Sequence, residues 1–302
     1  MKESRPHKFV SLSSKGIMFI IPFICGTVLF RLWPLIQVVV VSFLEGYSYL
    51  SNSFSSSGLH NYIALFNDAS FINALLNTFI YSLVVIASVL VIAFPTAWCL
   101  LRTKRLTPLF QFFIFLPFVT SDVAVGITWR ILFGTKGVVN LFVSLFRIGP
   151  LGWLTDAHFS LPTIILFGIW GNLPMSVLII YCSMLNIPKN IMIAAKTGGA
   201  NESQLFFRII LPMMRSTSLM VFSYLAVCTW VSMSALFTIF AGQPGPYYNL
   251  YTIGYYIYDE AQKGQQGFSL ACAASCVLMV LLSMLLILRF ALYHGKGRRA
   301  AS

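Results

Sequence analysis

Six long runs of apolar residues divide this chain, and they restrict its fold more than any other feature of the sequence. A helix needs roughly 20 apolar residues to cross about 30 Å of hydrocarbon, and each run is long enough to do so. Only helices and closed barrels satisfy every backbone group inside lipid, and the runs lack the alternation of strands. We therefore predict an all-α, polytopic membrane protein with six transmembrane helices, near residues 17–43, 71–101, 109–133, 161–185, 211–240 and 268–293.

The composition excludes an ordinary soluble domain. Hydrophobic residues make up 58% of the 302 residues and charged residues only 9%, more apolar surface than one soluble core can hide. The first run is too long and lies too far from the start for a cleaved signal peptide, so we expect a retained span. Arg31 and Pro34 lie inside it, and we expect a bend there. The serine-rich tract 51–57 is typical of a flexible outer loop.

Basic residues gather on one side of the predicted membrane. They are Lys2, Arg5, Lys8, Lys15, Arg102, Lys104, Arg105, Lys189, Lys196, Arg208, Arg215, Arg289, Lys296, Arg298 and Arg299. By the positive-inside rule this side is cytoplasmic, which predicts cytoplasmic tails at 1–16 and 294–302, a six-helix domain at 17–293 and a cytoplasmic loop at 186–212. The net charge of +12 is then a signal of topology. Nucleic-acid binding is not expected, because the basic residues are not gathered on one domain.

A polar segment with two adjacent glycines, I-A-A-K-T-G-G-A-N-E-S-Q-L-F-F-R-I-I-L-P, occupies residues 193–212 between the fourth and fifth runs. Pro188 can open a short helix before it, and Gly198 and Gly199 can close that helix by adopting a left-handed backbone conformation. Asn201 can cap a second helix, with Gln204 completing a capping box. The segment therefore predicts a helix, a glycine turn and a second helix. The alternative for such a segment is an amphipathic helix lying on the lipid surface.

The spacing of this segment resembles the EAA loop in the membrane subunits of binding-protein-dependent ABC importers. The matching residues are Ala194, Ala195, Gly199, Ile209, Leu211 and Pro212, with Ile193 at the position of the loop's glutamate. This fixed spacing favours a docking loop over a surface-lying helix. Shorter phrases at 58–62, 73–78 and 129–133 are similar to phrases of the maltose and glycerol-phosphate permeases, so the resemblance covers almost the whole chain.

The resemblance implies the type I ABC importer permease fold in a bacterial plasma membrane. Such a subunit forms a heterodimer with a second, homologous permease, binds two ATP-binding cassette ATPase subunits, and receives solute from an extracytoplasmic solute-binding lipoprotein. The implied solute is a carbohydrate, either an oligosaccharide or a sugar derivative. Loop 186–212 would couple to the ATPase, with the short helix 188–197 moving as a rigid body and tilting the fourth and fifth spans. Because Ile193 cannot replace a glutamate's ion pair, we expect docking through apolar contact, with Lys196 and Glu202 as replacement charges.

Motifs for catalysis are missing from the chain. No G-x-x-x-x-G-K-[ST] phosphate loop is present, so ATP hydrolysis is expected in a partner subunit. No H-E-x-x-H or G-x-S-x-G motif is present either, and we expect no catalytic residue, no cofactor and no metal. The six cysteines fall within the predicted spans, where packing is favoured over metal binding.

Polar and aromatic residues within the runs are candidates for a substrate pathway. They are Asp122, Trp170, Asn172, Trp230, Ser232 and Ser234. For the tryptophans and serines the alternative is helix packing or anchoring at the membrane interface. Asp122 stands apart, because a carboxylate in lipid costs at least about 2.5 kcal/mol and usually faces a cavity or a partner.

Two other classes of membrane protein remain open. An ion-coupled secondary transporter needs ion ligands at broken helices in two repeated halves, and Asp122 has no repeated counterpart. A membrane enzyme needs a catalytic cluster, and the sequence shows none. Co-purification with an ATPase subunit would distinguish an importer permease from both.

Overall fold

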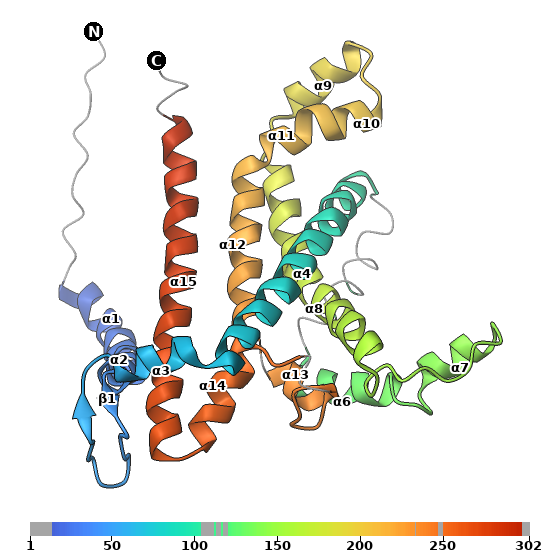
Figure 1. Ribbon diagram of the computed structural model, residues 1–302. Helices are drawn as coiled ribbons and strands as arrows, with labels where there is room; N and C mark the ends of the chain where they lie inside the picture. Colours follow the sequence, from blue (N-terminus) through green and yellow to red (C-terminus); the bar gives the residue numbers. More distant parts are fainter. Residues whose placement is uncertain are drawn as a thin grey trace.

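A computed structural model describes residues 14–103, 112, 116, 120–232, 234–246 and 250–297 of the chain. The fold is almost entirely helical, with long helices through the middle of the molecule and short elements at its two ends (Figure 1). Four of the described helices are long and apolar enough to cross a membrane, or five if a bent pair is counted as one span. The predicted helical membrane fold is confirmed, whereas the described residues do not reach the predicted count of six spans.

Three predicted spans are single long helices close to their predicted bounds. They are α4 (Ala69–Arg102), α8 (Ala157–Leu185) and α15 (Gln265–Gly297). Asp68 and Asp156 begin α4 and α8, because each carboxylate accepts a hydrogen bond from a backbone N–H two residues on, at 2.8 and 2.9 Å. Both helices continue through internal prolines, which membrane helices tolerate.

The first predicted span contains a π-helical segment. α1 (Ser14–Thr27) runs through η1 (Val28–Leu32) into α2 (Trp33–Ser42). Arg31 lies in the π-helical segment and Pro34 in the first turn of α2, so the irregularity falls where the sequence predicts a bend. The apolar side chains of this span are largely exposed in the isolated chain, Phe30 to 81%.

The predicted fifth span, 211–240, is wrong as one continuous helix. The helix that ends with α11 (Leu211–Met213) meets α12 (Arg215–Val231) at an angle of 70°. α12 ends at Val231 because the next residue, Ser232, has an extended backbone (ψ 111°), and a separate short helix, α13 (Ser234–Ile239), follows. Neither break can be predicted from the apolar run, because hydropathy depends on side-chain chemistry and not on backbone dihedral angles.

Part of the predicted third span, 109–133, lies outside the described residues, which within it are 112, 116 and 120–133. Its described end is α6 (Asp122–Leu132), which packs against α13 and is followed by α7 (Val138–Ser144). In Figure 1, α4 ends in the upper half of the view, whereas α6 lies at the bottom.

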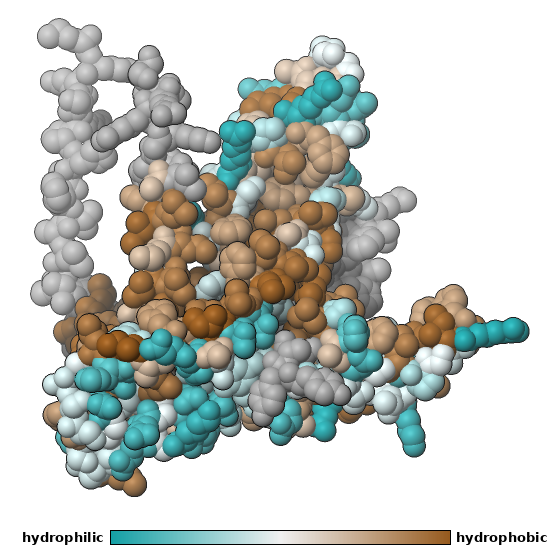
Figure 2. All heavy atoms as spheres, viewed as in Figure 1, coloured by the Kyte–Doolittle hydropathy of each residue, from teal (hydrophilic) through white to brown (hydrophobic). Residues whose placement is uncertain are grey.

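The two ends of the molecule carry different elements (Figure 1). At one end lie α9 (Lys189–Thr197), α10 (Glu202–Gln204) and the C-terminal end of α15. At the other end lie a two-stranded hairpin of β1 (Leu44–Glu45) and β2 (Ser56–Ser57) and several short helices. These helices include α3 (His60–Asn67), α14 (Ile253–Gln262), α6, α7 and α13. Figure 2 shows a hydrophobic band between hydrophilic ends, as expected of a membrane protein.

The serine-rich tract is ordered, contrary to the flexible loop that its composition predicts. Ser57 pairs with Leu44 in the hairpin, and Ser53 forms a bridge with Ser48. Asn61 in α3 supports the hairpin by donating to the carbonyls of Ser42 and Leu44, at 2.9 and 3.0 Å. Local backbone pairing and this buried amide explain the order, which composition alone does not show.

Candidate functional site

The loop after α8 has the helix–turn–helix form that its sequence predicts. α9 begins directly after Pro188 and ends in a Schellman motif. The Ala200 N–H donates to the Ala195 carbonyl and the Gly199 N–H donates to the Lys196 carbonyl, both at 3.0 Å. Gly199 has a left-handed backbone (φ +81°), whereas Gly198 is right-handed (φ −76°). The turn therefore requires glycine at position 199 and not at position 198.

The capping box that begins the second helix is confirmed. The Gln204 N–H donates to Asn201 Oδ1 at 2.7 Å, and the Asn201 N–H donates to Gln204 Oε1 at 3.0 Å. α10 then passes through a π-helical segment, η2 (Leu205–Ile210), into α11. Leu205, Phe206 and Ile210 are buried in the main hydrophobic core, so this arm of the loop is packed against the long helices.

Ion pairs connect the loop between α8 and α12 to the C-terminal end of α4. Glu202 forms ion pairs with Lys196 of α9 at 2.8 Å and with Arg102 of α4 at 2.9 Å. The Arg102 guanidinium also lies over the Trp98 ring, 4.3 Å from its centroid. The hydrogen bond from Lys196, followed by the positive charge of Arg102, lowers the pKa of the Glu202 carboxyl. Sequence reasoning expects Lys196 and Glu202 to serve as docking charges, and in the isolated chain they bind each other.

The residues that match the EAA spacing divide between the exterior and the core of the chain. Ile193 is 64% exposed, and Ala194 and Pro212 are exposed as well. Ala195, Ile209 and Leu211 are partly buried and pack against the main core. α9 therefore presents an exposed apolar residue near its middle, while the partly buried residues connect the loop to the long helices.

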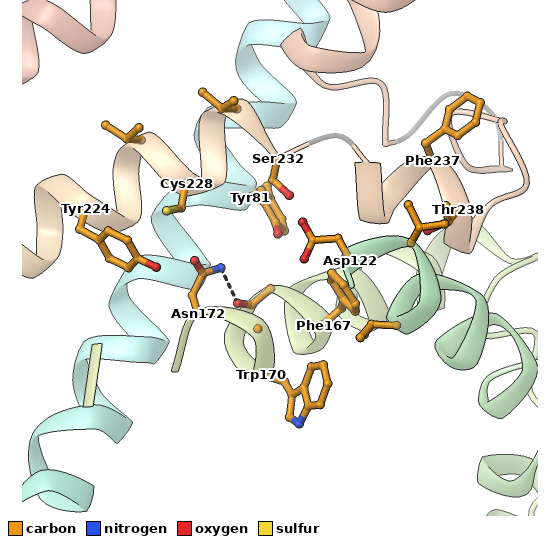
Figure 3. A pocket seen from close by; sticks show the side chains of 16 residues that line it. Tyr81, Asp122, Phe167, Trp170, Asn172, Tyr224, Cys228, Ser232, Phe237 and Thr238 are labelled. Atoms are coloured by element: carbon orange, nitrogen blue, oxygen red, sulfur yellow. Dashed lines mark hydrogen bonds between the residues drawn. The ribbon is translucent and has the colours of Figure 1, made fainter. Parts of the chain in front are cut away.

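A cavity of 1030 Å³ opens among α4, α6, α8, α12 and α13 (Figure 3). Its lining is mainly apolar and aromatic, with a few polar groups, a composition typical of a site for a small molecule. The lining residues are Tyr81, Asp122, Val123, Val125, Phe167, Gly168, Trp170, Gly171, Asn172, Tyr224, Val227, Cys228, Val231, Ser232, Phe237 and Thr238.

Four of the six predicted pathway residues line this cavity: Asp122, Trp170, Asn172 and Ser232. Figure 3 shows Asp122 and Ser232 on opposite walls, whereas the Trp170 ring lies on the other side of α8 from Ser232, where it packs against Trp129 with centroids 5.7 Å apart. Asn172 Nδ2 donates to the Gly168 carbonyl at 2.8 Å.

The other two predicted pathway residues do not contribute to the described lining. Trp230 is not a lining residue, and its Nε1 donates to Ser82 Oγ on α4 at 3.0 Å, which joins α12 to α4. Ser234 begins α13, and its side chain lies outside the described part of the structure.

Sequence reasoning missed several aromatic lining residues. Tyr224 is spaced four residues from Cys228, which is four residues from Ser232, so a search for polar groups on one helical face would have found it. Tyr81 gives no such signal. It is buried against Gly168, where a Cβ atom would collide with the tyrosine hydroxyl, so the absence of a side chain at 168 allows α4 and α8 to approach.

Comparisons with known proteins agree with this fold. The family model described as "Binding-protein-dependent transport system inner membrane component" matches residues 96–299. The lactose transport system permease protein LacF of Rhizobium radiobacter is 30% identical over 94% of this chain and 95% of its own length. The arabinooligosaccharides transport system permease protein AraP of Bacillus subtilis is 24% identical over 96% of this chain and 92% of its own length.

A solved structure shares the fold. A bacterial ABC transporter involved in the import of the acidic polysaccharide alginate contains a chain that superposes with a TM-score of 0.77, at 20% identity, over 95% of this chain and 96% of that chain. At this level of identity the likeness concerns the fold alone. With the family model covering more than half of the residues, the chain belongs to the family of inner membrane components of binding-protein-dependent transport systems.

Proposed function

We propose that this chain is the transmembrane permease subunit of an ATP-driven ABC importer, and that it translocates a carbohydrate delivered by an extracytoplasmic binding protein. The observation that carries the proposal is the full-length likeness to a lactose permease, at 30% identity. The cavity supports it, because aromatic rings, a carboxylate and hydroxyl groups are the groups that hold a polyhydroxylated ligand.

Three kinds of protein partner follow from the proposal. A second, homologous permease covers exposed apolar surface of this chain, including the first span around Phe30. Two ATP-binding cassette ATPase subunits bind beneath the pair of permeases, and α9 is the docking element of this chain, with Ile193 as an apolar contact that replaces the family's glutamate. A solute-binding lipoprotein docks at the opposite end, where the hairpin and α14 lie (Figure 1).

The proposed orientation places α9 and both termini in the cytoplasm of a bacterial cell. Loop 186–212 and tails 1–16 and 294–302 are then cytoplasmic, and 17–293 forms the membrane domain. The distribution of basic residues supports this orientation, as does the position of the C-terminal end of α15, which lies at the same end as α9 (Figure 1).

Coupling in this proposal is mechanical. α9 follows α8 directly, and the arm after Gly199 continues through the 70° bend into α12. Movement of the loop would therefore move α8 and α12, which both line the cavity. Asp122, Asn172 and Ser232 then lie on the substrate pathway, together with an edge of Trp170, whereas Trp230 joins two helices.

The test is affinity purification of the tagged chain from its own cell membranes in a mild detergent. The proposal expects a second permease and an ATPase subunit to co-purify. Ile193→Asp, which places a charge at the position of the exposed apolar side chain of α9, should lose the ATPase subunit and keep the second permease. Ser203→Asp adds the same charge to the neighbouring helix α10 and should keep both partners. Purification without any ATPase subunit from wild-type membranes would contradict the proposal.

A further inference from the structure

The described lining of the cavity carries one formal charge. Asp122 is an acid, and none of the described lining residues is lysine, arginine or histidine. Among the described residues, the Asp122 carboxylate forms no ion pair or side-chain hydrogen bond, and Figure 3 shows it directed into the space between α6 and α12. An acceptor without a protein partner in a mainly apolar cavity is available to a ligand's hydroxyl groups.

We infer that the cavity selects uncharged carbohydrates and rejects acidic ones, an inference that rests on the proposed function. Sugar hydroxyls donate to the Asp122 carboxylate, while Phe167, Tyr224 and Phe237 supply apolar and aromatic surface for the carbon faces of the rings. Family membership does not settle this point, because the relatives include a lactose permease and a fold neighbour that imports an acidic polysaccharide.

Electrostatic interactions in the cavity favour uncharged carbohydrates over acidic ones. A carboxylate or phosphate on the ligand would meet the like charge of Asp122 without a cation among the described lining residues to compensate, and like charges placed together weaken binding. The hydroxyl group of Ser232 offers an anion a hydrogen bond but no opposite charge. Mutation of Asp122 to asparagine keeps the shape of the side chain and removes that repulsion.

The test uses the complete transporter, purified in lipid nanodiscs without its binding protein, and saturation-transfer NMR as a direct measure of ligand binding. The uncharged probes are lactose, arabinotriose and galactobiose, and the acidic probe is digalacturonate, which differs from galactobiose only by oxidation at C6. We expect at least one uncharged probe to bind, and digalacturonate to bind about tenfold more weakly than galactobiose or not at all. In Asp122→Asn that difference should shrink to about threefold or less.

Asp156→Asn is the matched control. It removes a carboxylate outside the cavity, at the start of α8, and asparagine caps a helix as well as aspartate does, so the selectivity should stay as in the wild type. The inference is overturned if digalacturonate binds as well as galactobiose to the wild type, if Asp122→Asn leaves the difference unchanged, or if no uncharged probe binds. The proposed function fails separately, if the complete transporter with its binding protein imports no carbohydrate of either class when ATP is supplied.

Discussion

Gly199 offers the sharpest test of how the loop transmits motion, because its neighbour Gly198 is a built-in control. The backbone of Gly199 is left-handed (φ +81°), whereas that of Gly198 is right-handed (φ −76°). A Cβ atom at 199 would meet nothing within 4 Å, so alanine there is opposed by the backbone conformation alone, by about 1–2 kcal/mol. A Cβ atom at 198 would lie 3.5 Å from two backbone carbonyl oxygens, which is ordinary contact.

This energy changes the population of the native turn by a factor of about 5–30. The assay is the ratio of solute imported to ATP hydrolysed in proteoliposomes that contain the whole transporter. We expect Gly199→Ala to lower the ratio, Gly199→Val to lower it further, and Gly199→Asn to lower it least, because asparagine tolerates the left-handed region. Gly198→Ala should match the wild type. Membrane abundance should be unchanged throughout, because Gly199 is exposed. A normal ratio in Gly199→Val at normal abundance would refute the transmission mechanism.

Three further predictions concern the loop, the cavity and the helix contact. A double-mutant cycle of Lys196→Gln and Glu202→Gln should give a coupling of about 1 kcal/mol or less by thermal denaturation, because the pair is exposed. Folding lowers the pKa of the Glu202 carboxyl, so the coupling free energy should be fully present above a pH of about 4.3 and be lost as the pH falls through the folded-state pKa. A coupling that persists at lower pH would contradict the ion pair. Asp122→Ala should impair uptake at wild-type abundance, and unchanged uptake would remove Asp122 from the pathway. Trp230→Phe should lose the hydrogen bond to Ser82, destabilise by about 0.5–1.5 kcal/mol and keep uptake, whereas loss of uptake at full stability would return Trp230 to the site.

The long helices could be predicted because many apolar residues in each of them indicate the same structure. α4 and α15 are apolar for longer than a bilayer is thick, so an error at any one residue does not change the interpretation. The capping box at Asn201 and the turn at Gly199 could also be predicted, because each depends on a few neighbouring residues with specific backbone roles.

Features that depend on contacts distant in sequence could not be predicted. The pairing of Glu202 with Arg102 joins residues a hundred positions apart, and nothing local indicates it. The break at Ser232 lies within an apolar run that continues to Phe240, so the run suggests one helix where the chain forms two. The placement of Tyr81 against Gly168 follows from how α4 packs on α8.

The central claim is that this chain translocates solute under the control of a separate ATPase, and ATP-dependent uptake tests it most directly. The chain would be reconstituted in proteoliposomes with its co-purified permease and ATPase subunits, and exposed to the binding protein loaded with labelled carbohydrate. We predict accumulation of the label that requires ATP and the binding protein and that persists when ionophores remove all ion gradients. Accumulation that needs an ion gradient and proceeds without ATP would contradict the account and identify a secondary transporter.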